Sequence, residues 1–492
     1  MKKFILSLDQ GTTGTTSLLI DAESLQLVDK VNIEFPQIFP KPSWVEHNLN
    51  DIWKTVENSI IKLLQKNNIT SDQIKSIGIT NQRETTCAYD KSGEPLANAI
   101  VWQDRRTSTY CHENSKNYQK LQLKTGLPLD PYFSGTKMRW LLQNNEQVIQ
   151  AAKNNNLHLS TIDTFLLFKL TGGNSFFTEP SNASRTLLMD LDTCQWSDDL
   201  LNFFEIGSKF LPKIIESFDN FGQTQGLSFL NDNIPITCIL GDQQAALFGQ
   251  AGYKNGDLKC TYGTGAFILL NTGAEKIYSS NGLLTTVAYK KDGQACYALE
   301  GSCYIAGAAV QWLRDNLNII ESGPEVEVLA NKVNDLTEME HLLFMPFFTG
   351  IGSPHWKADA KGALIGITRD TNKQHIARAC LDGMALSIND SIQALIADAP
   401  SQVDSIKVDG GACQNNLLMQ IQASFSNKKI IRPKVIETTA YGVALGSMIG
   451  LGEINFSDLD NLWQEDKNFL PIKHSYFDNK LAQWNQYIKK LF

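Results

Sequence analysis

The chain has 492 residues, of which 42% are hydrophobic and 20% charged, a composition typical of a globular protein with more than one domain. A formal net charge of −8, without a run of Lys or Arg, argues against a nucleic-acid-binding protein. No apolar run approaches the ~18 residues of a membrane span. Nine scattered cysteines without a CxxC pair indicate reduced thiols in a cytoplasmic protein.

The first predicted element is a hairpin near the N-terminus. Apolar runs at residues 4–8 and 18–20 flank a loop of Asp, Gly and Thr. Such a loop suits a phosphate and metal site, because glycines let the backbone approach an anion, hydroxyls add donors and a carboxylate holds Mg²⁺. The residues concerned are Gly11 and Gly14, Thr12 and Thr13, and Asp9. An ordinary polar turn is the alternative interpretation.

Strand and helix patterns alternate after the hairpin. Residues 25–35 and 74–80 read as strands, and Asn50-Asp51 precedes an amphipathic helix over 52–64. This alternation predicts an α/β layout, whose ligands collect at strand ends.

Two polar or aromatic segments stand at such strand ends. Asn81-Gln82-Arg83-Glu84-Thr85-Thr86 follows the strand at 74–80, and Trp102 closes an apolar run that starts at residue 99. A solvated loop and a packed core Trp are the structural alternatives.

The rest of the first half supplies one more candidate. Residues 130–137 are predicted to form a turn, and 161–170 and 200–204 helices. The strand at 234–241 runs directly into Asp242, which begins a helix. An Asp at this junction is most often an N-cap, but the same position suits a catalytic base.

The second half opens with a repeat of the hairpin. Within residues 257–270 a strand leads into Gly263-Thr264-Gly265 and out into another apolar strand, roughly half the chain after the first copy. This repeat indicates a duplicated architecture that binds phosphates between its halves, with a boundary near Gly252. Neither loop is a Walker A, which needs Gly-Lys-Ser/Thr before a helix. The duplication favours nucleotide phosphate binding.

Two later segments suit a nucleoside. Residues 300–313 are predicted to form a helix rich in small residues, with Gly307 and Gln311 on one face. Small residues there serve either close helix packing or contact with a flat base. Residues 406–418 read as a strand, a Gly-Gly turn and a helix start, which brings Gly411 and Asn415 to a turn where a nucleoside can rest. A simple tight turn is the alternative. Residues 440–452 form a buried helix, and the tail from 458 shows no chemistry.

These loops resemble those of the actin, sugar-kinase and heat-shock ATPase superfamily, and within it the FGGY carbohydrate kinases, specifically the glycerol kinases. The resemblance runs nearly end to end and implies an α/β fold of two duplicated actin-like (ribonuclease H-like) domains, residues 1–252 and 253–492, with an interdomain active-site cleft. The segments that carry it are Asp9-Gln-Gly-Thr-Thr13, Trp44-Val-Glu-His47, Gly78-Ile-Thr-Asn-Gln-Arg-Glu-Thr-Thr86, Asp130-Pro-Tyr-Phe-Ser-Gly-Thr-Lys137, Gly241-Asp-Gln-Gln-Ala-Ala-Leu-Phe-Gly-Gln250 and Thr261-Tyr-Gly-Thr-Gly265.

The resemblance implies ATP-dependent phosphorylation of glycerol to glycerol 3-phosphate, the entry step of glycerol catabolism. Asp242 would be the general base and Asp9 the Mg²⁺ ligand. Residues expected to bind glycerol are Arg83, Glu84, Tyr132, Asp242 and Gln243, with Trp102 and Phe267 as walls. Residues expected to bind ATP or ADP are Thr12, Thr13, Gly14, Thr264, Gly307, Gln311, Gly411 and Asn415.

We also expect a homodimer or homotetramer, and the charge and the cysteines stated above predict a cytoplasmic protein without a nucleic-acid partner. Two departures limit the resemblance: Thr16 stands where many relatives have Arg, and residues 230–236 lack the Arg with which some bacterial relatives bind a sugar-phosphate inhibitor. The alternatives are an FGGY kinase for another polyol or sugar, and a non-catalytic ATP-binding regulator. Such a regulator would not need Arg83, Glu84, Trp102, Tyr132 and Asp242 together.

Overall fold

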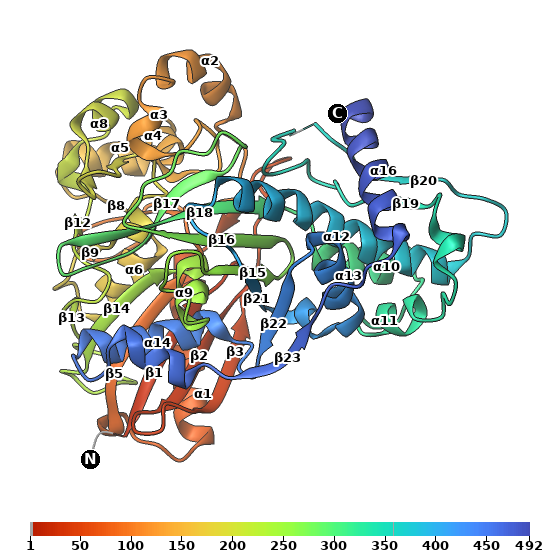
Figure 1. Cartoon of the computed structure of the whole chain (residues 1–492). Helices are drawn as coiled ribbons and strands as arrows, with labels where there is room; N and C mark the ends of the chain where they lie inside the picture. The colour runs from red at the N-terminus through yellow and green to blue at the C-terminus, as the bar shows by residue number, and fades with distance from the viewer. Residues whose placement is uncertain (1–2, 358) are drawn as a thin grey trace. The chain divides into compact units, whose positions relative to one another are not determined.

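The N-terminal hairpin lies inside a six-stranded sheet in the computed structural model, which describes residues 3–357 and 359–492 (Figure 1). Strands β14, β5 and β1 run parallel, and β2 and β3 continue the sheet antiparallel from β1. The strands, in sheet order, are β13 (Gly222–Gln223), β14 (Pro235–Gly241), β5 (Ile74–Asn81), β1 (Phe4–Gln10), β2 (Gly14–Asp21) and β3 (Leu27–Glu34).

Helices cover both faces of this sheet, which explains why β1 is buried along most of its length. Helix α1 (Leu49–Lys66) packs on β2 and β3, and α14 (Thr438–Gly450) packs on β14, β5 and β1. A Cβ on Gly78 of β5 would lie 2.2 Å from the Val443 carbonyl oxygen of α14, so only glycine permits this approach. The third layer is completed by α9 (Asp242–Gly249), which packs against α14.

Smaller elements surround this sheet. A four-stranded sheet has the order β4 (Glu46–His47), β7 (Ala99–Ile100), β6 (Thr86–Tyr89) and β8 (His158–Thr161). The helices of the same region include α2 (Ser108–Tyr118), α4 (Ser134–Asn144), α5 (Glu146–Lys153), α6 (Ile162–Leu170), α7 (Pro180–Ala183) and α8 (Asp198–Phe204). The expected turn at residues 130–137 is corrected, because its second half forms the first turn of α4.

The second hairpin belongs to a seven-stranded sheet with the order β17-β18-β16-β15-β21-β22-β23. Here β15, β21 and β22 run parallel, and β16 returns antiparallel beside β15. The bounds are β17 (Leu284–Lys291), β18 (Gln294–Cys303), β16 (Ala266–Gly273), β15 (Leu258–Tyr262), β21 (Ser405–Asp409), β22 (Lys429–Pro433) and β23 (Glu465–Phe469). In each sheet, two further strands therefore run parallel to the first strand of a phosphate-type hairpin and lie on the same side of it, which is the duplicated α/β architecture expected from the sequence.

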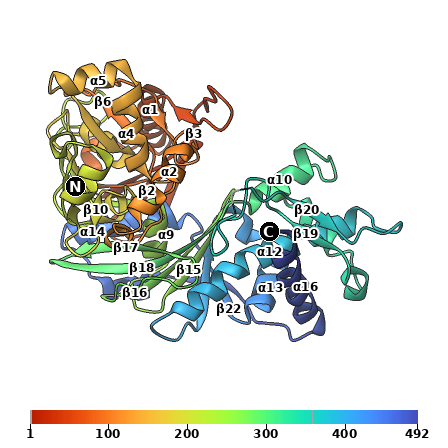
Figure 2. The same ribbon diagram turned by 90° about the horizontal axis from the view of Figure 1, so that it is seen from above.

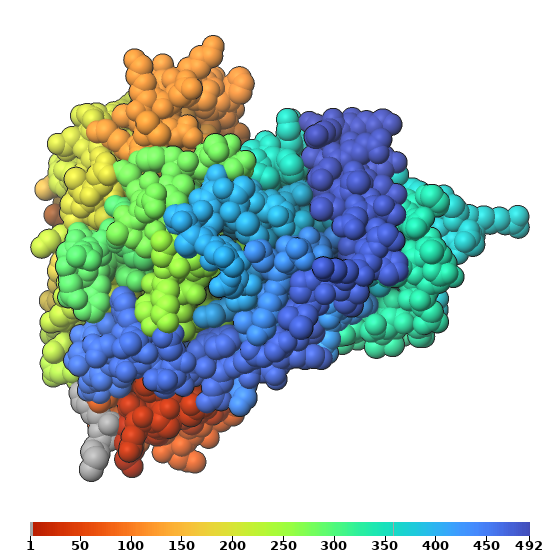
Figure 3. All heavy atoms as spheres, in the orientation of Figure 1, coloured from red at the N-terminus to blue at the C-terminus, as the bar shows by residue number. Residues whose placement is uncertain are grey.

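Long helices cover the second sheet (Figure 2). Helix α12 (Lys373–Asp398) packs against α11 (Glu325–Ala330) and α13 (Asn416–Ser426), and α13 packs against the C-terminal helix α16 (Ser475–Leu491). On the face drawn in Figure 3, α16 reaches the surface, whereas its Trp484 is fully buried. The tail from residue 458 therefore completes the core.

The segment expected to form one helix over residues 300–313 instead changes type within it. Its first residues, up to Cys303, finish β18, and helix α10 (Gly307–Asp315) begins after a short turn. Of the small residues that suggested helix packing, those at 301–303 lie in this buried strand, and those at 307–309 lie in the first turn of α10.

By contacts, the described chain forms two units. Unit 1 holds residues up to 251 together with 285–297 and 438–462, and unit 2 holds 252–284, 298–437 and 463–492. The chain first passes between the units at 251/252, beside the boundary expected near Gly252, and later passes four more times. Within residues 3–357 and 359–492, no helix has the length and apolar character needed to cross a membrane.

Candidate active site

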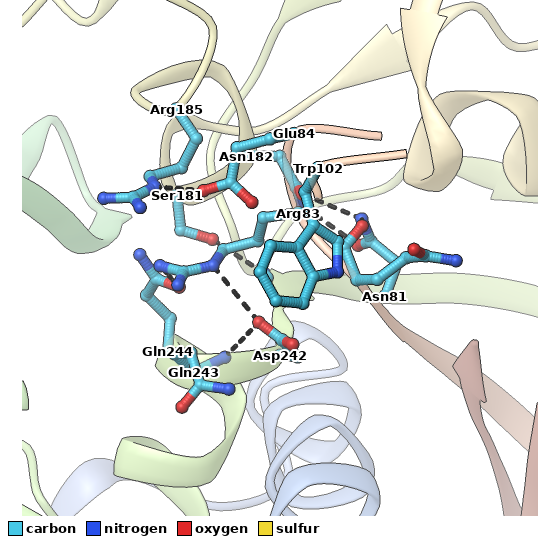
Figure 4. Close-up of polar contacts among 12 residues, drawn as sticks. Asn81, Arg83, Glu84, Trp102, Ser181, Asn182, Arg185, Asp242, Gln243 and Gln244 are labelled. Atoms are coloured by element: carbon cyan, nitrogen blue, oxygen red, sulfur yellow. Dashed lines mark hydrogen bonds and ion pairs between the residues drawn. The ribbon is translucent and has the colours of Figure 1, made fainter. Parts of the chain in front are cut away.

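Two neighbouring parallel strands of unit 1 end in charged residues that meet. Asn81, the last residue of β5, pairs with Gly241, the last residue of β14. Arg83 and Asp242 follow these positions, and the Nε atom of Arg83 lies 3.1 Å from Oδ1 of Asp242 (Figure 4). Only 2% of the Arg83 side chain is exposed, against 29% for Asp242, so the carboxylate is the accessible partner.

Asp242 begins α9 without capping it. Gly241 occupies the N-cap position with an extended backbone, and Oδ1 of Asp242 accepts a hydrogen bond from the N–H of Gln243 at 2.7 Å. The guanidinium of Arg83 also donates to Oε1 of Gln244 at 3.1 Å. The alternative interpretation of Asp242 as the N-cap is therefore wrong, because the N-cap is Gly241, one residue earlier.

The backbone before Asp242 is anchored by a buried polar group. The N–H of Gly241 donates to Oγ of Ser181, which donates in turn to Glu179. Burial raises the pKa of Glu179 to about 7, although Ser217 and nearby N–H groups also donate to its carboxylate. Asn182, beside Ser181, donates to the amide oxygen of Asn81 and ties the ends of β5 and β14 to α7.

Glu84 is held in an unusual backbone conformation with φ of 60°, which is uncommon outside glycine and typical of functional sites. Oγ of Ser134 donates to its carbonyl oxygen at 2.9 Å. The Nε atom of Arg185 lies 2.5 Å from Oε1 of Glu84, and both side chains are buried. The Arg185 guanidinium also lies 5.3 Å from the centre of the Tyr132 ring, so one cation links two expected glycerol ligands.

The rings of Trp102 and Tyr132 meet edge to face with their centres 5.6 Å apart. Nε1 of Trp102 donates to Oγ1 of Thr12 at 2.9 Å, so this expected wall residue contacts the first phosphate hairpin. Lys137 donates to the Tyr132 carbonyl oxygen at 2.6 Å, and burial lowers the pKa of its ammonium to about 7. Unit 1 thus holds every residue expected to bind glycerol except Phe267, which belongs to β16 of unit 2.

The first hairpin has a four-residue tip, closed by a hydrogen bond from Gly11 N–H to the Gly14 carbonyl. Thr12 and Thr13 lie in this tip. Asp9 does not: it lies inside β1, opposite Thr16 of β2. The expectation that Asp9 stands at the tip is corrected, since the ladder extends to the next residue.

A Mg²⁺ ion that is shared with nucleotide phosphates needs only one or two protein carboxylates, with water filling the other positions. Among the residues that the structure describes, no three His, Cys, Asp or Glu side chains gather as a cation cage. Asp9, one carboxylate beside the hairpin tip, fits that mode of binding.

The second hairpin is bonded to the helix that follows β18. The carbonyl oxygen of Thr264 accepts from Ala306 and Ala308, and that of Gly263 accepts from Gly307, at 2.8–3.1 Å. The tip therefore packs directly on the first turn of α10.

A cavity of about 390 Å³ lies in unit 2 beside α10. Its lining includes all four residues expected at the nucleoside, Gly307, Gln311, Gly411 and Asn415. A Cβ on Gly411 would meet nothing within 4 Å, so this glycine borders open space. Asn415 has a structural task as well, because its Oδ1 accepts from the N–H of Leu418 and caps α13.

Models of one family match both halves of the chain. Residues 4–249 match the N-terminal domain, and residues 258–451 the C-terminal domain, of the FGGY family of carbohydrate kinases. The chain belongs to this family. As an FGGY protein it is similar to the glycerol kinase of Bdellovibrio bacteriovorus, with 46% identity covering 100% of both chains, and to that of Desulforamulus reducens, with 47% identity covering 98% and 96%.

Solved structures of the family share this fold. A Plasmodium falciparum glycerol kinase with ADP matches with a TM-score of 0.90 at 35% identity, covering 99% of this chain and 98% of its own. A gluconate kinase from Lactobacillus acidophilus matches with a TM-score of 0.87 at 22% identity, covering 99% and 97%, and bears on the fold alone.

Sequence reasoning missed several residues that hold the site. Arg185 and Gln244 contact Glu84 and Arg83, and Glu179 anchors the end of β14 through Ser181. The sequence shows only that residues 178–186 form a largely polar run, and the structure adds that the whole run is buried. A long polar run without exposure indicates a hydrogen-bonded site.

Proposed function

We propose that the chain phosphorylates glycerol with ATP to give glycerol 3-phosphate. The observation that carries the proposal is the meeting of Arg83 and Asp242 at the ends of two parallel strands, beside Glu84 and Tyr132. A triol needs several charged partners, because each hydroxyl loses water on binding. The glycerol kinases that align with the whole chain support this substrate over other polyols.

Asp242 would accept the proton of the attacking hydroxyl. Its Oδ1 is engaged by Arg83 and by the Gln243 N–H, which fixes the carboxylate and leaves Oδ2 to face the substrate. Arg83, Glu84, Tyr132 and Gln243 would hold the hydroxyls, while Trp102 and Phe267 would cover the carbon skeleton. Transfer needs a positioned hydroxyl and a carboxylate that takes its proton; these side chains would position the glycerol hydroxyl, and Asp242 would supply the carboxylate.

The nucleotide would be bound by unit 2 and by the first hairpin. A cavity of about 390 Å³ is within the range of small-molecule sites, and its mixed lining suits a nucleoside. Thr12, Thr13, Gly14 and Thr264 would donate to the phosphates. When bound through Asp9, Mg²⁺ would neutralise charge on the phosphoryl oxygens.

A cytoplasmic location is part of the proposal, supported by nine free and buried cysteines. The homodimer or homotetramer and an active site between the two halves stay predictions.

A panel of substrates tests the proposal. Coupled release of ADP is measured with glycerol, xylulose, gluconate and other polyols, with and without Mg²⁺. We expect kcat/KM for glycerol to exceed every other value at least ~100-fold, since a site fitted to a triol leaves the extra carbons and polar groups of a longer substrate without room or hydrogen-bond partners. A preference for a sugar would favour a different FGGY kinase.

A further inference from the structure

The carbonyl groups at the tip of the first hairpin are held from within unit 1. Gln10 donates to the Gly11 carbonyl oxygen at 2.8 Å, and Gln82 donates to the same oxygen at 3.2 Å. Gln37 donates to the carbonyl oxygen of Thr12 at 3.0 Å. A trans peptide points its C=O and N–H in opposite directions, so these bonds turn the following N–H groups the other way.

A chain of hydrogen bonds runs through Gln37 to Thr12, and each residue in it donates to the next. Because its amide nitrogen donates to Thr12, its Oε1 is the atom that accepts from Nε2 of His47, at 2.7 Å. His47 then carries its proton on Nε2, and its Nδ1 accepts from Nε2 of Gln82 at 3.3 Å. Oε1 of Gln82 accepts from Thr85.

His47 suits this task only as a neutral ring. It is fully buried, and desolvation lowers its pKa to about 4. The Phe35 ring packs against it edge to face, with ring centres 4.9 Å apart. A protonated imidazole would have no acceptor at Nδ1 and would break the chain at Gln82.

Thr85, where this chain of hydrogen bonds begins, is also linked to the side-chain hydroxyl of Thr12 through Trp102. The backbone N–H of Trp102 donates to Oγ1 of Thr85, and its indole Nε1–H donates to Oγ1 of Thr12 at 2.9 Å. An indole N–H is only a donor, so the Thr12 hydroxyl accepts here and keeps its own hydrogen for another partner.

We propose that Gln37, His47 and the indole N–H of Trp102 are positioning residues that hold Thr12 as a hydrogen-bond donor toward a nucleotide phosphate. Both oxygens of Thr12 are accepting, one from Gln37 and one from Trp102, which leaves its O–H and the adjacent backbone N–H groups to face an anion. This inference rests on the proposed kinase function and gives Trp102 a second role beside that of a wall. It also gives a role to the Trp44-Val-Glu-His47 segment.

A double-mutant cycle tests the link to Thr12. Trp102→Phe keeps an aromatic wall and removes the indole donor, whereas Thr12→Val removes the hydroxyl and keeps the shape. We expect each variant to lower kcat/KM for ATP about tenfold, and the double variant to be no worse than Thr12→Val alone. Effects that multiply would overturn the proposal, because the two groups would then act independently.

Gln37→Met tests the other end of the chain. It removes the amide at similar length, and we expect kcat/KM for ATP to fall about fivefold while KM for glycerol stays within twofold. Gln393→Met is the matched control, since it removes an amide bonded to Asn389 and Ser426 in unit 2 and should leave both constants unchanged. A loss of glycerol and ATP binding alike, or no loss, would overturn the proposal. If Gln37→Met fails to fold, the double-mutant cycle of Trp102→Phe and Thr12→Val alone tests the proposal.

Failure of the proposed function would look different. A wild-type chain that does not phosphorylate glycerol refutes that function, and ATP binding by calorimetry still measures the cycle. If the wild type phosphorylates glycerol but the effects of Trp102→Phe and Thr12→Val multiply in the double variant, only the inference is refuted.

Discussion

Replacing Asp242 by Asn separates its structural and chemical roles. The amide oxygen of the introduced asparagine would still accept from the Gln243 N–H, and Gly241 already serves as the N-cap of α9, so the helix start is kept. The stability cost comes from the lost charge opposite the buried Arg83. Because 29% of the Asp242 side chain is exposed and Gln244 still accepts from Arg83, that cost is about 1–2 kcal/mol.

The chemical cost is larger. An amide does not take a proton at neutral pH, so kcat should fall about 10²–10⁴-fold, which corresponds to about 3–5 kcal/mol of barrier. The lower end applies if the transition state is loose and needs little help from a base. The assay measures kcat at saturating glycerol and ATP, with the free energy of unfolding from urea titration alongside.

Asp242→Glu serves as the control, since it keeps a carboxylate at slightly different reach and should retain more turnover than Asn. A folded Asp242→Asn enzyme with turnover within about threefold of the wild type would refute the general-base assignment and leave Asp242 as a glycerol ligand.

Asp9→Ala should lower kcat about 10²-fold and leave KM for glycerol within twofold, because a metal ligand acts on the phosphates; equal losses in both would argue against a metal role. Phe267→Ala should raise KM for glycerol about 3- to 10-fold through lost apolar contact, and an unchanged KM would make Phe267 a core residue. His47 has its pKa lowered from 6.5 to about 4, so the stability it contributes is full above pH 6.5 and is lost as pH falls toward 4. Between pH 7 and pH 5, urea unfolding of the wild type should therefore lose about 2 kcal/mol more than that of His47→Phe; parallel losses would show that His47 is not the titrating group.

The parts of the fold that the sequence predicted are those whose structure is decided by residues close together in the chain. Both hairpins, the strand ending at Asn81 and the strand ending at Gly241 follow from short apolar runs bounded by glycine and polar residues. The error at residues 300–303 has a local cause too, because Gly, Ser and Cys give no clear period in a buried strand.

The supports of the site were hidden from the sequence because they join distant segments. Gln37 and Gln82 lie in two loops and His47 lies in β4, and nothing in the order of residues indicates that they share hydrogen bonds. The return of residues 285–297 and 438–462 to unit 1 is likewise a product of long-range packing.

The most direct measurement counts products. The purified chain is mixed with ATP, Mg²⁺ and glycerol, and glycerol 3-phosphate and ADP are quantified together over time. The account predicts that the two appear in a 1:1 ratio and that neither accumulates at a comparable rate without glycerol. Release of ADP without glycerol 3-phosphate would contradict it and would favour an ATP-binding regulator or a kinase for another substrate.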